Sequence, residues 1–391
     1  MKNVIIISSN YTGHGHKSIS EALQEQFNLH KDIIINIIDG FDLAGNMGVQ
    51  VGKSYGLVTR NAKKLWNLAW KISSRNLYVM HEFIELSVKH NFVNLLKKLK
   101  PDLILCVHPI FNTPIINILK EYRINIPFVT FVADLVSISP LWADKRANCI
   151  ICPTEEAKER CIGFGVAEEN IKVFGFPVRS RFTKHISQKI SKPSYILDNP
   201  MQCLVMSGGE GSGDMGSIAK TLLDNFNCNV NIIAGRNKSL KEKLNKTLSL
   251  QYPGRINILG YTSNIEEYML TSDIAFTRGS PNVMMEAVAC NVPLIITGAL
   301  PGQEQENPDF AEKNNLGIVC KDISNLYEIV SELLADNGKK LNAIKESQLQ
   351  YFDHNSAQKI VEHTLSLINN SSYKYPSEFR LRRKFNRLAL K

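Results

Sequence analysis

Residues 277–307, TRGSPNVMMEAVACNVPLIITGALPGQEQEN, contain a strand-to-helix turn followed by a second strand. The apolar residues 273–277 predict a short strand that ends just before Arg278. Pro281 then suits the first turn of a helix, because its ring fixes φ and its missing N–H is not needed there. A second apolar run, 293–297, leads into the polar cluster QEQEN. Successive strands that end in polar loops are typical of an open α/β sheet, in which ligands bind at the carboxyl ends of the strands.

The same stretch carries the groups that a nucleotide sugar needs. Glu286 could accept hydrogen bonds from two ribose hydroxyls, and the side-chain amides of Gln303 and Asn307 could bind sugar hydroxyls. A helix N-terminus beside a Gly-rich turn suits a phosphate, because its free N–H groups and its dipole both favour an anion. The chemistry of the stretch therefore predicts a nucleotide-sugar site.

Length and composition indicate a globular protein of two or three domains. The chain has 391 residues, of which 44% are hydrophobic, and this is enough for a sizeable core. Its eight Cys residues show no paired framework, so Cys149 and Cys152 are interpreted as buried thiols and no metal site is predicted. Because the sequence shows neither a signal peptide nor an apolar run of about 18 residues, we expect a cytoplasmic protein without a membrane-spanning helix.

Apolar runs alternate with amphipathic segments along the chain, and this rhythm breaks once. The predicted strands are residues 3–9, 33–38, 103–107, 128–133, 149–152 and 171–174 before the break, and 203–206, 230–233, 256–259, 273–277 and 293–297 after it. This order predicts two Rossmann-like, doubly wound α/β domains facing across a cleft, the GT-B architecture. The predicted boundaries are an N-terminal acceptor-binding domain at 1–180, a linker at 181–202, a C-terminal nucleotide-sugar-binding domain at 203–352, and a helix with a basic tail at 353–391. Nucleotide-sugar epimerases share this architecture, so the fold alone leaves the function open.

A Gly-rich run, GGEGSGDMG at residues 208–216, follows the first strand of the second half. It contains a G-x-G-x-x-G pattern, but the next strand ends in AGRN, without the acidic residue that a dinucleotide's ribose needs. The backbone N–H groups of Gly208 and Gly209 could instead bind a diphosphate. The alternative is a turn that only connects a strand to a helix.

A His-rich turn, GHGH at residues 13–16, follows the first strand and would face the cleft. A neutral imidazole can accept a proton from a hydroxyl, so His14 or His16 could act as a base. His108 and Asp134 each follow a predicted strand and could reach the same cleft. For each of these residues a purely structural role, as a helix cap or a loop turn, is the alternative.

Basic residues gather in two segments of a chain whose net charge is +9. Residues 53–100 hold ten Lys/Arg against two Glu, and residues 374–391 hold seven against one. Both segments interleave these cations with aromatic residues, as helices on an anionic membrane surface do. A core-facing apolar stripe and a nucleic-acid partner are the alternatives, and we expect a membrane surface rather than nucleic acid.

Several spaced motifs together resemble one known family. They are G-x-G-H at 13–16, H-P at 108–109, D-L…P-x-W at 134–142, V-x-G-x-P-V-R at 173–179, G-G-E-G at 208–211, G-R-N-K at 235–238 and P-G-Q-E…N at 301–307. With them the chain resembles the monogalactosyldiacylglycerol synthase-like glycosyltransferases and the related bacterial diacylglycerol glucosyltransferases of glycosyltransferase family 28. The resemblance covers nearly the whole chain, and the family's invariable His falls on His16.

The resemblance implies an inverting transferase that moves a hexose from UDP-galactose or UDP-glucose to a lipid acceptor such as diacylglycerol, peripherally on the inner face of the cell membrane. It implies that His16 and Asp134 are catalytic, and that no metal or other cofactor is required. The implied nucleotide-sugar contacts are Gly208, Gly209, Arg236, Arg278, Ser280, Pro281, Glu286, Gln303, Glu304 and Asn307. The implied acceptor contacts are Gly15, His108, Pro109 and Trp142.

Two positions depart from the family pattern. Ser139 stands where the family has a His, and RGSP at residues 278–281 replaces the usual Lys-containing loop. Arg278 keeps a positive charge beside the expected phosphate. A UDP-N-acetylhexosamine 2-epimerase, a transferase with another acceptor and a non-enzymatic nucleotide-sugar sensor remain open as alternatives.

Overall fold

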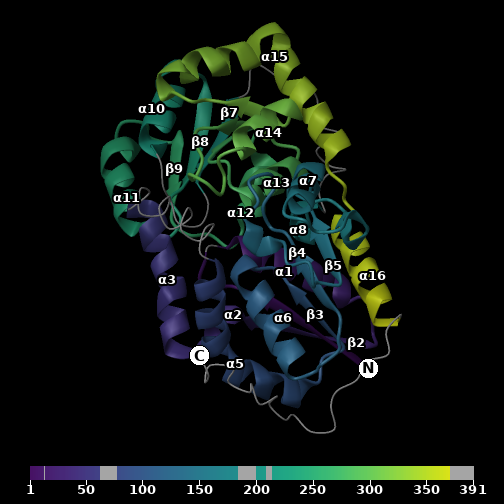
Figure 1. Cartoon of the computed structure of the whole chain (residues 1–391). Coiled ribbons are helices and arrows are strands. Elements are labelled where there is room, and N and C mark those ends of the chain that lie inside the picture. Colours follow the sequence, from purple (N-terminus) through teal and green to yellow (C-terminus); the bar gives the residue numbers. More distant parts are fainter. Residues whose placement is uncertain (13, 62–76, 184–199, 208–213, 370–391) are drawn as a thin grey trace, which may run out of the picture.

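The computed structural model describes residues 1–12, 14–61, 77–183, 200–207 and 214–369, which form two α/β domains (Figure 1). The described strands of each domain form one six-stranded sheet, in the order β2-β1-β3-β4-β5-β6 in the first and β12-β11-β10-β7-β8-β9 in the second. All neighbouring strands are parallel. The predicted pair of doubly wound domains is therefore confirmed.

Continuous apolar runs form the first sheet, as expected of parallel strands whose two faces are both covered. The side chains from Val4 to Ile7, on an inner strand of this sheet, are fully buried. The strands are β1 (Lys2–Ser8), β2 (Ile33–Asp39), β3 (Leu103–Cys106), β4 (Phe128–Phe131), β5 (Cys149–Cys152) and β6 (Ile171–Val173). The α-helices are α1 (Gly15–Phe27), α2 (Gly40–Leu43), α3 (Gly45–Asn61), α5 (Leu77–Leu99), α6 (Asn112–Glu121), α7 (Glu155–Gly163) and α8 (Ser180–Thr183).

The second domain follows the same plan and includes one strand that the sequence analysis did not identify. That strand, β12 (Gly317–Val319), has only three residues and no alternating pattern. The other strands are β7 (Met201–Met206), β8 (Cys228–Ile233), β9 (Ile256–Leu259), β10 (Ile274–Thr277) and β11 (Leu294–Ile296). The α-helices are α10 (Met215–Asn225), α11 (Lys238–Leu244), α12 (Ile265–Thr271), α13 (Pro281–Ala289), α14 (Asn307–Lys313) and α15 (Leu326–Tyr351).

The strand orders place the polar loops of the two domains at equivalent points. In the first sheet the chain leaves β1 for β2 on one side and later returns to β3 on the other. In the second sheet β7 has the same position between β8 and β10. Loops diverge at such a reversal and leave a crevice at the carboxyl ends of the strands. The turn that carries His16 and the turn that carries Ser280 therefore each stand at a crevice.

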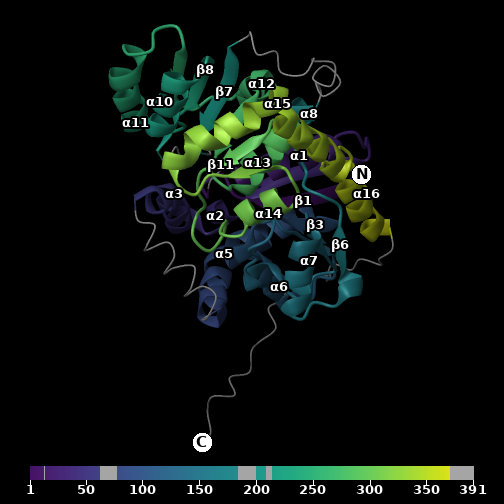
Figure 2. The same cartoon turned by 90° about the horizontal axis from the view of Figure 1, so that it is seen from above.

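The end of the described chain returns to the first domain. After α15, which is bent at residues 335–338, helix α16 (Ser356–Asn369) lies beside the first domain (Figures 1 and 2). Ile360 and Val361 are buried there in the same hydrophobic cluster as β1. The predicted domain boundaries stay predictions, although α8 and the start of β7 fall inside or at the edges of the range 181–202.

Gln348, on α15, is fully buried and binds the backbone just before β11 and β12. Its amide Nε2 donates to the carbonyl oxygens of Val292 at 2.9 Å and Leu316 at 2.7 Å. We expect Gln348→Met to lower the free energy of unfolding by about 2–4 kcal/mol, because two buried carbonyls would lose their donor. Urea unfolding followed by circular dichroism measures the change. The matched variant Gln358→Met, on an exposed position of α16, should change stability by less than about 0.5 kcal/mol, and equal effects would contradict the assignment.

Candidate active site

A cavity of about 390 Å³ lies between the two domains, within the range of about 300–1,000 Å³ that small-molecule sites occupy. Both domains form its wall. Nine of the residues predicted for the site line it: Gly15, His16, Asp134, Arg278, Ser280, Pro281, Glu286, Gln303 and Glu304. The structure thus brings the predicted base and the predicted ribose ligand to one space.

His16 stands in the first turn of α1 and is held by a single strong hydrogen bond. Its Nδ1 lies 2.6 Å from the carbonyl oxygen of Val107, at the end of β3. A carbonyl only accepts, so the proton is on Nδ1 and Nε2 keeps its lone pair. Burial lowers the pKa of His16 to about 4, against the opposing effect of the Val107 hydrogen bond. The ring is therefore neutral at pH 7 and can accept a proton through Nε2.

The ring of His108 packs against the ring of His16, and His108 does not line the cavity. The two rings are 4.4 Å apart between centroids, and Nε2 of His108 is 3.0 Å from the hydroxyl of Thr12. Burial first, and the neighbouring His16 second, lower the pKa of His108 well below its ordinary value. An acceptor-binding role for His108 stays a prediction, because its side chain is only 5% exposed.

Asp134, in the loop after β4, connects the two domains. Its Oδ2 accepts from Trp142 Nε1 at 2.7 Å, and its Oδ1 accepts from Gln303 Nε2 of the second domain at 3.1 Å. Burial raises the pKa of Asp134 to about 6, although both hydrogen bonds oppose the rise. Gln303, predicted to bind the sugar, is therefore engaged with Asp134 here, and a bound sugar would have to share or replace this contact.

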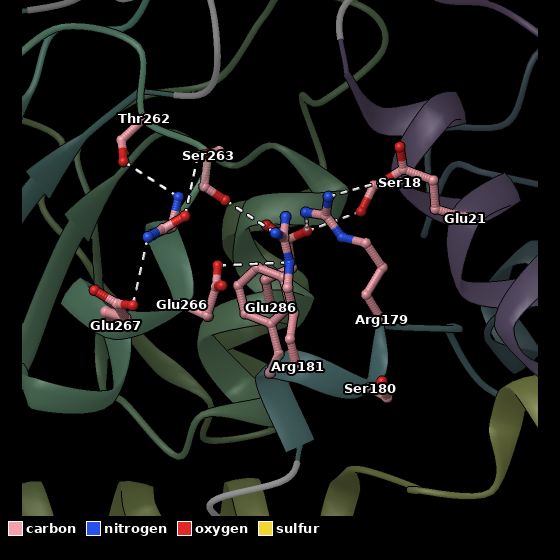
Figure 3. Close-up of polar contacts among 12 residues, drawn as sticks. Ser18, Glu21, Arg179, Ser180, Arg181, Thr262, Ser263, Glu266, Glu267 and Glu286 are labelled. Carbon is pink, nitrogen blue, oxygen red and sulfur yellow. Dashed lines mark hydrogen bonds and ion pairs between the residues drawn. The ribbon is translucent and has the colours of Figure 1, made fainter.

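Glu286, on the second turn of α13, is 7% exposed and lines the cavity. Its Oε1 accepts from Ser18 Oγ of α1 at 2.9 Å and from Arg179 Nη2 at 2.8 Å (Figure 3). Burial raises the pKa of Glu286, and the charge of Arg179 lowers it part of the way back. The predicted ribose carboxylate therefore also bridges the domains.

The loops after β10 and β11 are held together by Arg278. Its guanidinium pairs with Glu304, with Nε at 2.6 Å from Oε2 and Nη2 at 3.0 Å from Oε1. Glu304 also accepts from the backbone N–H of Leu300 at 2.8 Å. The Asn307 amide is fully buried and donates to the Gly279 carbonyl oxygen at 2.8 Å. Glu304 and Asn307 thus order the loop, and Arg278 and Ser280 form its surface toward the cavity.

The remaining predicted residues lie further back or outside the described residues. Trp142 is fully buried behind Asp134, and Pro109 begins a short 3-10 helix, Pro109–Phe111. Arg236 stacks over the ring of Tyr261, with its Cζ 5.2 Å from the ring centroid. Gly208 and Gly209 lie outside the described residues.

Ser139, which departs from the family pattern, has a structural role in this chain. Its hydroxyl is the N-terminal cap of the 3-10 helix Pro140–Trp142 and accepts from the backbone N–H of Leu141 at 3.4 Å. The side chain is 3% exposed. It therefore helps to place Trp142 rather than to line the cavity.

Two residues of the cavity wall that contact Glu286, Ser18 and Arg179, were not predicted from the sequence. Ser18 lies two residues after His16 in an ordinary amphipathic helix, so nothing in the local pattern distinguishes it. Arg179 closes the V-x-G-x-P-V-R motif at residues 173–179, and this motif could have indicated it. Within the described ranges, no group of three or more His, Cys, Asp and Glu side chains could hold a metal ion.

Comparison with solved structures gives the fold. The chain superposes on MurG of Acinetobacter baumannii with a TM-score of 0.63 at 14% identity, covering 94% of this chain and 100% of that one. It matches the UDP-GlcNAc 2-epimerase of Neisseria meningitidis bound to UDP-GlcNAc with a TM-score of 0.60 at 16% identity, over 94% and 100%. It matches HepE of Anabaena in complex with UDP-glucose with a TM-score of 0.55 at 15% identity, over 94% and 100%. These similarities show a shared fold.

Comparison of sequences distinguishes among proteins of that fold. Residues 16–178 match the family model "Monogalactosyldiacylglycerol (MGDG) synthase", and residues 217–350 match "Glycosyl transferases group 1". Monogalactosyldiacylglycerol synthase 1, chloroplastic, of Arabidopsis thaliana is 27% identical over 95% of this chain and 72% of its own length. The chloroplastic synthase of Spinacia oleracea is 26% identical over 95% of this chain and 74% of its own length.

Fold, interdomain site and family models together define a glycosyltransferase of GT-B architecture. Within that class, the chain is similar to the monogalactosyldiacylglycerol synthase-like glycosyltransferases, whose family model matches residues 16–178. The resemblance seen in the spaced motifs is confirmed. The epimerase alternative is not favoured, because the epimerase of Neisseria meningitidis is similar in fold at 16% identity, whereas the synthase of Arabidopsis thaliana is 27% identical over 95% of this chain.

We predict that His16 stays neutral and Nδ1-protonated far below the pH at which an exposed imidazole titrates. Its pKa of about 4 lies below the ordinary value of about 6.5, because burial penalises the charged form. Nitrogen-15 NMR of the imidazole, with His16→Gln to assign the signals, measures both the pKa and the tautomer. A midpoint near 6.5, or a proton on Nε2, would contradict this description of the site.

Proposed function

We propose that the protein transfers a hexose from a UDP-sugar to the hydroxyl of a lipid acceptor such as diacylglycerol. The observation that carries the proposal is that a neutral imidazole and a buried carboxylate, His16 and Glu286, line one interdomain cavity. One domain supplies a proton acceptor, and the other supplies a group suited to a ribose diol. Proteins of the same fold have been solved with UDP-GlcNAc and UDP-glucose, which supports a nucleotide-sugar donor.

In the proposed reaction, Nε2 of His16 accepts the proton of the acceptor hydroxyl as the oxygen attacks the anomeric carbon. A new glycosidic bond forms, the bond from the anomeric carbon to the phosphate oxygen breaks, and UDP leaves with the electron pair. Attack from the side opposite UDP inverts the configuration. The negative charge of Asp134 would stabilise the imidazolium that forms, in a site where electrostatic effects are strong because water is excluded.

The donor would lie on the second domain, with its ribose at Glu286 and its diphosphate near the N-terminus of α13. Ser280 and Pro281 begin this helix, and no side chain caps it. The free N–H groups and helix dipole suit a phosphate and would stabilise the charge of the leaving group. Arg278, whose charge is paired with that of Glu304, lines the cavity beside this helix. This arrangement requires no metal ion to support UDP departure.

An exposed apolar face on the first domain supports a lipid acceptor. Met47 and Val51 on α3 are both 61% exposed, and Phe83 and Leu86 on α5 are 59% and 68% exposed. Large apolar side chains so exposed on two helices that contact each other are typical of a surface that meets a partner or a membrane. We propose that this face binds the cell membrane at its inner side, assisted by the basic residues of 53–100 and 374–391. Residues 62–76 of the first segment and the whole of the second segment lie outside the described residues.

The described residues contain no helix that is both long enough and apolar enough to span a bilayer. The proposed contact with the membrane is therefore at its surface, through side chains that enter the headgroup region. A transferase that uses another lipid or a glycosylated lipid as acceptor would have the same cavity and the same face. The experiment below separates these possibilities by using several acceptors.

The activity is tested by incubating the protein with UDP-galactose or UDP-glucose and vesicles of diacylglycerol with anionic phospholipid. We expect one hexosyl-diacylglycerol product of inverted configuration by mass spectrometry and NMR. His16→Ala should reduce kcat by about 100-fold or more, because a general base contributes about 10²–10⁴ to the rate. UDP binding without a glycolipid product from either donor, with diacylglycerol and with glycolipid acceptors, would contradict the proposal and favour a sensor. Interconversion of UDP-N-acetylhexosamines without an acceptor would instead indicate an epimerase.

We expect Met47→Ser combined with Phe83→Ser to weaken binding to anionic vesicles by at least about tenfold, because full burial of each large apolar side chain would contribute about 1.5–3 kcal/mol. Sedimentation with sucrose-loaded vesicles measures binding. Leu250→Ser is the matched control, because Leu250 is 87% exposed but lies on the second domain. An equal loss in the control, or no loss in the double variant, would exclude this face as the membrane contact.

A further inference from the structure

The two oxygens of the Glu286 carboxylate have different environments. Oε1 accepts both hydrogen bonds from the first half of the chain, from Ser18 Oγ at 2.9 Å and Arg179 Nη2 at 2.8 Å. None of the described residues is hydrogen-bonded to Oε2, and the side chain lines the cavity. Figure 3 shows Ser18 and Arg179 converging on Glu286 from the same side. One oxygen is thus anchored, and the other is available for a ligand.

Arg179 is itself held firmly. Its second terminal nitrogen, Nη1, donates to Glu21 Oε2 of α1 at 3.0 Å, and its Cζ lies 5.2 Å from the ring centroid of Phe182. Its side chain is only 15% exposed. Burial alone would lower the pKa of Arg179, but the carboxylates of Glu286 and Glu21 raise it. The planar guanidinium therefore has one orientation, and it fixes the carboxylate that it contacts.

We propose that Ser18 and Arg179 are positioning residues for nucleotide recognition, which orient the Glu286 carboxylate so that Oε2 faces the ribose diol. This inference rests on the proposed function, because it needs Glu286 to be the ribose ligand. Neither residue has to contact the nucleotide. Both precede residue 180, whereas Glu286 belongs to the second domain. Full recognition of the ribose then requires the first domain to be docked against the second.

The proposal differs from two other roles that Arg179 could have. If Arg179 bound the diphosphate directly, its loss would weaken the binding of every nucleoside diphosphate, with or without ribose hydroxyls. If Arg179 only occupied the place of the ribose, its loss would strengthen UDP binding. A positioning role predicts a third result: the loss is confined to nucleotides that have ribose hydroxyls.

Arg181 provides a matched control two residues away. Its Nη1 donates to the carbonyl oxygen of Ser263 at 2.9 Å, and its Nε lies 3.5 Å from Glu266 Oε2 on α12 (Figure 3). Its Cζ is 5.5 Å from the same Phe182 ring. It therefore bridges to the second domain as Arg179 does, but it has no hydrogen bond to Glu286. A loss that comes only from loosened domains would appear in both variants.

The experiment measures the affinities of UDP and 2′,3′-dideoxy-UDP by calorimetry for the full-length protein and its variants. The wild-type protein should prefer UDP. Arg179→Gln and Ser18→Ala should each weaken UDP binding by roughly three- to tenfold, the usual net effect of losing one intramolecular hydrogen bond. Both variants should change the affinity for 2′,3′-dideoxy-UDP by no more than about twofold, so the preference for UDP becomes smaller. Arg179→Lys should restore part of this preference, because an ammonium keeps the positive charge but lacks the paired N–H donors of a guanidinium. Arg181→Gln should keep the wild-type preference.

Each outcome is informative. An equal loss for both nucleotides in Arg179→Gln, tighter UDP binding, or the same loss of preference in Arg181→Gln would overturn the positioning role. If the wild-type protein does not distinguish the two nucleotides, and Glu286→Ala binds UDP normally, the ribose assignment of the proposed function itself fails. Circular dichroism of every variant identifies a change that comes from misfolding, and Ser18→Ala, which removes only one oxygen atom, keeps the test decisive if Arg179→Gln does not fold.

Discussion

The site depends on one topological constraint, which is that a parallel sheet opens a crevice where its strand order reverses. Both sheets reverse next to their first strand, at β1 and at β7. The crevices face each other, so His16 and Glu286 line one cavity although 270 positions separate them in the chain. The intervening residues mainly build two sheets that hold these turns. The geometry of the candidate site is therefore a property of the interface between the domains.

Electrostatics at this interface is arranged in two clusters. In one cluster Glu286 joins Ser18 and Arg179, and in the other Asp134 joins Gln303. Each cluster places a buried carboxylate against a donor from the opposite domain. A buried carboxylate that loses its hydrogen-bond partner destabilises the protein. Each cluster therefore favours the arrangement in which the two domains are in contact. The groups that could react with substrate are also groups that hold the domains together.

The sequence was sufficient for the fold and for part of the site. Long apolar runs such as 3–9 and the Pro-initiated helix at Pro281 were correctly predicted, because burial on both faces and fixed φ leave local marks. The strand β12 has only three residues, too few for a recognisable pattern in the sequence. His16 and Glu286 were identifiable from motif and chemistry, and their roles stay predictions. Ser18 was not identifiable, and Gln303's bond to Asp134 was not foreseen, because both depend on how the domains dock.

The path of the chain limits how the cavity can open. Helix α15 belongs to the second domain, and the short connection at residues 352–355 leads from it to α16, which packs against α1 of the first domain. This connection ties the two domains together at one edge. We therefore expect entry of the sugar donor to involve rotation of one domain about this connection, rather than separation of the halves. Substrate would then enter from the edge of the cavity furthest from the connection.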